Sequence, residues 1–154
     1  MKEPKALNSV AEFHRTFNLP IEKEPIIPSK KRCDLRVNLI QEELDELKDA
    51  IKDNDMVEVA DALADLQYVL SGAILEFGLG DKFQQIFDEV QRSNMSKTCK
   101  NKEEALATQK FYEDNRDMNS EIIERNGEFL VYRVNDGKVL KSVNYSPADI
   151  KGQL

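Results

Sequence analysis

The sequence predicts an all-α fold, a helical bundle of four to five helices with a small C-terminal β-hairpin. Apolar residues recur at helical spacing through most of residues 1–117 and alternate, as in strands, only after that point. At 154 residues the chain is long enough to bury one sizeable core. We therefore expect a single domain over residues 1–154, helical over 1–117, with a hairpin extension over 118–154.

The first helix is predicted from Ser9, a good N-cap residue, to Pro20, which ends it. One face carries Val10, Phe13, His14 and Phe17. Because His14 lies on this apolar face, we interpret it as a hydrogen-bonded core histidine rather than a catalytic base. Residues 20–31 hold three prolines and three lysines without helical periodicity, so we expect an extended basic loop.

A second helix is predicted from about Asp34 to Ile51 and a third from about Asp55 to Phe77. The apolar stripe of the second is Ile40, Leu44, Leu47 and Ile51. The third is apolar almost all round, which is typical of a helix buried on most faces. Gly78 and Gly80 follow it as C-terminal signals.

Two further helices and a hairpin complete the prediction. Asp81 is the expected cap of a fourth helix, whose stripe is Phe83, Ile86, Phe87 and Val90. Asn101 and Glu104 have the spacing of a capping box for a fifth helix. For the hairpin we expect a first strand around Phe129 to Val134, a turn at residues 135–137, and a second strand over Val139–Val143.

Charge and cysteine content narrow the function classes. The formal net charge of -7 argues against nucleic-acid binding, which needs a basic surface. A polyanionic substrate would therefore need a bridging cation. Cys33 and Cys99 form no CxxC pair, and we interpret them as reduced thiols. No apolar run approaches the ~20 residues that span a bilayer, and the N-terminus lacks a signal-peptide core, so we expect a cytoplasmic protein with no membrane partner.

Acidic residues lie beside the apolar stripes of the second and third helices. Glu43 and Glu46 border the stripe of the second helix, and Glu58, Asp61 and Asp65 share one face of the third. Crowded, partly dehydrated carboxylates repel one another, so a positive charge must compensate them. Carboxylate ligand sets suit hard cations such as Mg²⁺ or Mn²⁺. A solvated acidic face is the alternative, and for Glu42 and Asp45 it is equally acceptable.

The fourth helix becomes polar one turn after Val90. The side chains of Ser93, Asn94 and Lys97 fall within about 60° of the Val90 direction. Such groups can donate hydrogen bonds to phosphate oxygens next to a metal site. A helix end that emerges into water is the alternative interpretation.

These residues match a known family pattern. Glu42-Glu43-Leu44-Asp45-Glu46, followed twelve residues later by Glu58-Val59-Ala60-Asp61, resembles the EExxE…ExxD signature of all-α NTP pyrophosphohydrolases. That group includes MazG-like proteins, dimeric dUTPases and phosphoribosyl-ATP pyrophosphohydrolases. Three flanking segments, VADALADLQYVLSGA, EVQRSNMSK and DGKVLKSVNYSPADI, also look like segments of the family. Together they cover most of the chain.

The resemblance implies Mg²⁺-dependent hydrolysis of a nucleoside triphosphate to a monophosphate and pyrophosphate. It places Mg²⁺, or Mn²⁺ as a substitute, on Glu43, Glu46, Glu58 and Asp61. Glu42 completes the motif and, with Asp65, is a candidate general base. Asn94 and Lys97 match positions that contact nucleotide phosphates. The preferred base and sugar are left open.

The resemblance also implies a dimer. The composition supports it, because a nearly all-apolar helix leaves more hydrophobic surface than one chain covers, and we expect a homodimer or a dimer of dimers. Two other function classes stay open at this point. One is a non-catalytic nucleotide binder on the same scaffold, and the other is a helical interaction protein whose acidic stripe meets a basic partner.

Overall fold

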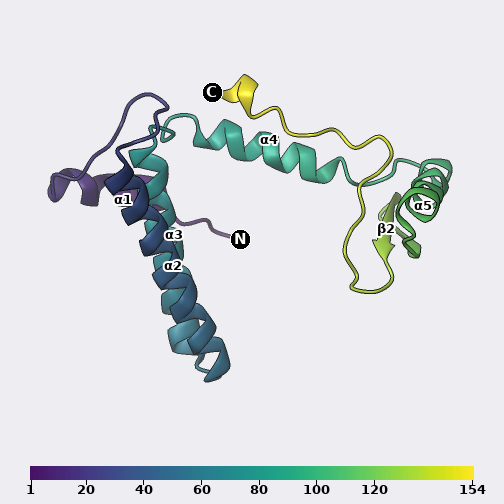
Figure 1. Ribbon diagram of the computed structural model, residues 1–154, viewed down its shortest axis with the longest axis horizontal. Helices are drawn as coiled ribbons and strands as arrows, with labels where there is room; N and C mark the ends of the chain where they lie inside the picture. Colours follow the sequence, from purple (N-terminus) through teal and green to yellow (C-terminus); the bar gives the residue numbers. More distant parts are fainter. The chain divides into compact units, whose positions relative to one another are not determined.

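The structure is a computed structural model that describes residues 1–154 (Figure 1). It contains five α-helices, one two-stranded hairpin and a short 3₁₀ helix, so the mostly helical class with a hairpin is confirmed. The chain divides into two compact units, Met1–Phe83 and Gln84–Leu154. None of the helices is long and apolar enough to cross a membrane.

The first unit is built on a helical hairpin of α2 (Lys30–Lys52) and α3 (Met56–Glu76). Asn54, with a φ of 55°, supplies the left-handed residue of the short turn between them. The side chain of Asp55 caps α3 by accepting hydrogen bonds from the amides of Val57 and Glu58. Because the connection is this short, the motif residues of α2 lie alongside those of α3.

Gly78 ends α3 and, because it has no side chain, leaves room for the loop that precedes α2. Its amide bonds Leu75 O and the amide of Leu79 bonds Ile74 O, the two hydrogen bonds of a Schellman motif. Gly78 has a φ of +68°, and a Cβ here would lie 1.9 Å from Glu24 O. The loop before α2 therefore passes directly over this glycine, and no larger residue fits.

Helix α1 (Ala6–Thr16) covers the C-terminal end of α3. It begins three residues before the predicted cap, Ser9, which lies inside the helix. Val10 and Ala11 are buried against Leu75 and form the core of this unit, with Leu7 and Ile21 at its edge. The core thus lies at one end of the helical hairpin.

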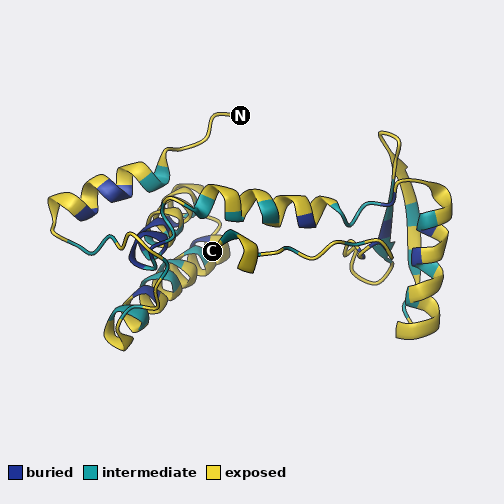
Figure 2. Cartoon of the chain, turned by 90° about the horizontal axis from the view of Figure 1, so that it is seen from above, coloured by how far each residue is buried: buried dark blue, intermediate teal, exposed yellow.

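The rest of α3 is not buried within the chain, and this corrects our prediction (Figure 2). Met56 and Val57 are each 76% exposed and Leu63 is 52% exposed. Most buried residues of α3 lie from Ser71 to Glu76, where α1 and the loop cover the helix. In the N-terminal half, α2 packs against one side of α3 and buries Ala62, whereas the apolar side chains on its other sides stay exposed.

The second unit contains α4 (Phe83–Met95), α5 (Lys102–Arg116), β1 (Ser120–Arg125), β2 (Glu128–Arg133) and the 3₁₀ turn η1 (Lys151–Gln153). Its core consists of Cys99, Ala105, Val131 and Leu140. The predicted cap of α5 is confirmed, since Asn101 Oδ1 accepts from the amide of Glu104. In an ideal capping box the Glu104 carboxylate would accept from the amide of the cap residue, Asn101. Here it accepts from the amide of Lys100, one residue earlier.

The predicted hairpin was placed too late in the chain. Its turn is Asn126-Gly127, where both residues have positive φ, and Ser120 pairs with Arg133 at the open end. Of the predicted second strand, Val139 makes one isolated bridge to Tyr132. The predicted stripe of α4 is also largely uncovered, with Phe87 58% exposed.

Candidate functional site

Glu43 on α2 is surrounded by other acids. Its carboxyl is partly buried, and burial raises its pKa, as do the negative charges of Glu46, Asp65, Glu42 and Asp61. The structure therefore brings five of the six predicted acids within electrostatic range of one another. They come from facing parts of α2 and α3, as the sequence predicted.

Glu58 stands apart from this group. It lies in the first turn of α3, where its own amide donates to the Asp55 cap, and it is not among the acids that act on Glu43. Glu58, Asp61 and Asp65 are all exposed. The prediction that Glu58 and Asp61 lie in apolar surroundings is therefore wrong for the single chain, because only α2 packs against this half of α3.

The donor chemistry of the cluster fits a hard cation. All of its groups are carboxylates, and a bound divalent ion would remove the repulsion that raises the pKa of Glu43. No three of these side chains are close enough in the chain to hold one ion together.

Asp45 belongs to a solvated face instead. Its carboxylate accepts hydrogen bonds from Lys48 Nζ at 2.7 Å and Gln41 Nε2 at 2.9 Å. These bonds hold the pKa of Asp45 below its usual range. The alternative that we left open for Asp45, a solvated helix face, is confirmed by these contacts.

A buried ionic network at the other end of the hairpin was not predicted. Glu76 is 1% exposed and accepts hydrogen bonds from the guanidinium groups of Arg32 and Arg36. Burial opposes its ionisation, but the two arginines outweigh this effect, and the pKa of Glu76 is lowered. Two arginines four residues apart on α2, with one acid in an apolar stretch of α3, are the signal in the sequence.

His14 completes the network and confirms its interpretation as a core residue. Its Nδ1 lies 2.8 Å from Pro20 O and must donate, so Nε2 accepts from Arg36 at 3.3 Å. A Cβ on Gly72 would lie 2.5 Å from Arg36 Nη1. The glycine therefore provides the space in which the buried guanidinium lies.

A row of three aromatic side chains, one from α3 and two from α1 and its C-terminal end, lies beyond the acids of α3. Tyr68, one turn after Asp65, makes an edge contact with Phe13 at 5.7 Å between ring centroids. Phe13 in turn lies 4.4 Å from Phe17. All three rings are more than a third exposed, so they offer an apolar surface to a planar ligand.

A cavity of about 640 Å³ opens between α1 and the loop that follows it. Its wall includes Ala11, Arg15, Lys23, Leu75 and Asp81. His14 also lines it, so the buried network forms one side of the cavity. The volume falls in the range typical of small-molecule sites.

Asn94 and Lys97 lie in the second unit, at the end of α4 and in the turn after it. Lys97 Nζ donates to Asn94 Oδ1 at 2.7 Å, so the two are neighbours as predicted. Ser93 is 4% exposed and hydrogen-bonds the Tyr145 hydroxyl at 2.9 Å. Sequence reasoning did not connect Tyr145 with this helix end.

Comparison with known proteins supports the pattern. The family model for phosphoribosyl-ATP pyrophosphohydrolase matches residues 10–94, a segment that contains all six acids and Asn94. The uncharacterized protein L479 of Acanthamoeba polyphaga mimivirus is 24% identical, over 87% of this chain and 89% of its own length. The family match extends over more than half of the chain, so the chain belongs to the phosphoribosyl-ATP pyrophosphohydrolase family of the all-α NTP pyrophosphohydrolase superfamily.

Proposed function

We propose that this chain hydrolyses a nucleoside triphosphate, or a related nucleotide such as phosphoribosyl-ATP, to the monophosphate and pyrophosphate. One observation carries the proposal. Within the segment that matches the family, α2 and α3 gather carboxylates around Glu43, whose pKa is raised by burial and by these neighbouring negative charges. An exposed acidic cluster without basic partners is suited to a substrate that arrives with divalent cations.

Four side chains would hold Mg²⁺, or Mn²⁺ in its place: Glu43, Glu46, Glu58 and Asp61. When bound, the ion supplies charge neutralisation for the phosphates and lowers the pKa of a water for attack. Glu42 or Asp65, which lie beside Glu43 without being in this set, would take the proton from that water. Asn94 and Lys97 would donate hydrogen bonds to phosphate oxygens.

The aromatic row of Phe13, Phe17 and Tyr68 is the surface on which we place the nucleobase. It begins one turn from Asp65, so a base stacked there leaves its phosphates near the acids. Base stacking on aromatic rings tolerates any base. Discrimination between bases would then come from polar groups nearby, among which Arg15 and Asn18 line the adjacent cavity.

We also propose that the chain acts as a homodimer or a dimer of dimers. The uncovered apolar surface of the helical hairpin includes Val37, Ile51, Met56, Val57 and Leu63, each more than half exposed. Large apolar patches on a helix pair are the usual sign of an interface with another chain. A second copy of the hairpin would cover it and bury the acids of α3 further.

A panel of nucleotides, scored for pyrophosphate release with and without Mg²⁺, tests the proposal. We expect turnover of at least one nucleotide, abolished by EDTA and restored by Mg²⁺ or Mn²⁺. Ca²⁺, which is larger and less demanding of octahedral geometry, should bind but support turnover poorly. A nucleotide that raises the melting temperature without being hydrolysed would identify a non-catalytic binder instead. No response to nucleotide or Mg²⁺ would favour a helical interaction protein.

A further inference from the structure

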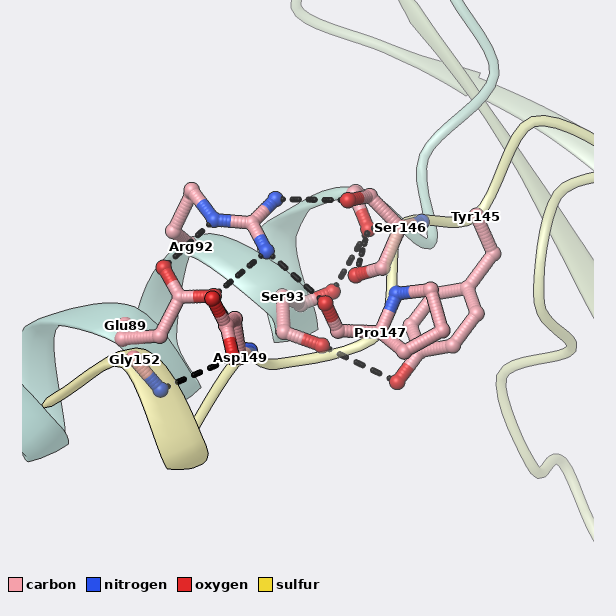
Figure 3. A network of polar contacts seen from close by, with 9 residues as sticks. Glu89, Arg92, Ser93, Tyr145, Ser146, Pro147, Asp149 and Gly152 are labelled. Carbon is pink, nitrogen blue, oxygen red and sulfur yellow. Dashed lines mark hydrogen bonds and ion pairs between the residues drawn. The ribbon is translucent and has the colours of Figure 1, made fainter. Parts of the chain in front are cut away.

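The C-terminal segment of the chain is fastened along α4 by directed hydrogen bonds (Figure 3). Arg92 donates to the side chain of Ser146 and to Pro147 O, each at 3.0 Å. Glu89, itself paired with Arg92, accepts from the amide of Asp149 at 2.7 Å. A segment held at this many points has a defined position on the helix.

This attachment places two side chains of the segment beside the end of α4. The Tyr145 hydroxyl lies 2.9 Å from Ser93 Oγ, and Lys141 Nζ lies 4.2 Å from the centre of the Tyr145 ring. Ser93 precedes Asn94 and Lys97, the pair expected to contact phosphate. The polar end of α4 and the segment therefore form one surface.

This surface carries two lysines, Lys97 and Lys141, beside the ring and hydroxyl of Tyr145. The hydrogen bond from Ser93 and the positive charges of Lys141 and Lys97 lower the pKa of Tyr145, although burial acts in the opposite direction. Neither lysine takes part in any of the ion pairs of the structure. Both lysines act on the same tyrosine, so they form a local positive surface in a chain with a net charge of -7.

We infer that Lys141 and Tyr145 bind phosphate groups together with Lys97 and Asn94. Two ammonium groups, a phenol hydroxyl and an amide nitrogen are donors that match the oxygens of a polyphosphate. Asn94 uses its carbonyl oxygen for Lys97, which leaves its nitrogen to donate. The identification of the anion as the phosphate groups of a nucleotide rests on the proposed function. The C-terminal segment then supplies part of a phosphate-binding surface within the second unit.

Binding of inorganic tripolyphosphate to the full chain, measured by calorimetry in Mg²⁺-free buffer, tests the inference. Loss of one charge-assisted hydrogen bond weakens binding by about tenfold, so Lys141→Ala should raise the dissociation constant by about that factor. Tyr145→Phe should raise it about threefold, since a neutral hydroxyl contributes less. Lys110→Ala, which removes an exposed lysine on α5, is the matched control and should bind as the wild type does.

Lys141→Arg guards against a folding artefact, because it keeps the charge and should retain binding within about threefold. If Lys141→Ala binds tripolyphosphate as tightly as the wild type, the inference is wrong. A loss of equal size in Lys110→Ala would also overturn it, since only net charge would then matter.

Nucleotide kinetics separate this inference from the proposed function. If the wild type hydrolyses a nucleotide and Lys141→Ala raises the KM for it with little change in kcat, the inference and the proposed function both stand. If the wild type hydrolyses none of the nucleotides, but Lys141→Ala still weakens tripolyphosphate binding, the proposed function fails and the anion site stands. Normal hydrolysis with unchanged KM and unchanged tripolyphosphate binding in Lys141→Ala would overturn the inference alone.

Discussion

Glu43 and Asp45 lie two residues apart on α2, and their neighbours give them opposite properties. Asp45 accepts from Lys48 and Gln41, which lowers its pKa. Glu43 is partly buried and lies near four negative charges, and both effects raise its pKa. An acid stabilised by its surroundings needs no ligand, whereas a repelled acid gains when a cation binds. The electrostatic environment thus separates Glu43, a candidate ligand, from Asp45, a surface residue of the same motif.

Replacing a proposed ligand should remove activity and leave the fold intact. We predict that Glu58→Gln and Asp61→Asn each abolish hydrolysis, while the metal-free chain melts at an unchanged or higher temperature. For Asp61 the reason is relief of its repulsion with Glu43. Asp45→Asn is the matched control and should leave hydrolysis unchanged. Strong destabilisation of the metal-free protein by both substitutions would mean that these acids are structural.

Glu76→Gln should instead destabilise the first unit without touching the site. The substitution leaves the guanidinium of Arg36, 7% exposed, buried without its counter-charge. Breaking a buried ion pair in this way costs about 3–5 kcal/mol. Urea unfolding followed by circular dichroism measures it, with Glu12→Gln on the exposed face of α1 as control. A loss below about 1 kcal/mol would show that Glu76 is not the centre of the network.

Single residues were predictable where the signal is local. His14 was predicted as a hydrogen-bonded core residue because it shares an apolar face with Val10, and the structure confirms this. Glu76 was missed because its partners lie 40 and 44 positions away on α2. These side chains meet because the turn between α2 and α3 aligns the two helices. A local sequence pattern does not encode that alignment.

At the scale of elements, the predicted caps of α3 and α5 were correct, whereas Ser9 lies inside α1 and α4 begins two residues after Asp81. Helix α3 begins after Asp55 and ends before Gly78, both recognised in the sequence. Helix α2 begins at Lys30, four residues before the prediction, because the lysines of residues 30–31 were assigned to the loop. The hairpin was misplaced because a turn signal at residues 135–137 was preferred to Asn126-Gly127, the stronger one.

The contact between Gly78 and the loop before α2 gives an element-scale prediction. Gly78→Ala should release this loop, since a Cβ would meet Glu24 O and the φ is positive. The amides of Glu22 and Ile26, which bond Leu75 O and Phe77 O, should lose hydrogen-exchange protection. Gly127→Ala is the control, because its φ is also positive but its Cβ meets nothing. Unchanged exchange in Gly78→Ala would contradict the proposed packing.

The attachment of the C-terminal segment should depend on pH. Arg92 and the Asp149 amide lower the pKa of Glu89 to about 2 from an ordinary value of 4.5. The folded-state pKa is lowered, so this contact stabilises the segment above pH 4.5 and is lost as the pH falls towards 2. The chemical shift of the Asp149 amide in a pH titration reports it. A midpoint near 4.5 would show that Glu89 does not hold the segment.

At the scale of the whole molecule, the exposed apolar side chains of the helical hairpin α2–α3 predict self-association. Light scattering at micromolar concentration should give at least twice the chain mass of 17.7 kDa. Leu63→Glu places a charge in the exposed apolar face of α3 and should shift the mass towards the monomer. A wild-type protein that is monodisperse near 17.7 kDa would contradict the prediction.

The burial of α3 marks the limit of what the sequence could predict at this scale. Its apolar composition correctly indicated surfaces that need covering, but the sequence could not say whether one chain supplies the cover. The structure shows that α1 and the loop cover only the end near Leu75. The acids of α3 are exposed for the same reason.

Analysis of the reaction products in ¹⁸O-labelled water tests the central claim most directly. If the acidic cluster holds the cation that binds the phosphates, and the α-phosphorus is attacked, the products are a labelled monophosphate and unlabelled pyrophosphate. Label in the pyrophosphate would show that water attacks the β-phosphorus, although the two products are the same. Release of orthophosphate together with a nucleoside diphosphate would mean that the γ-phosphate is attacked, and this result would contradict the account.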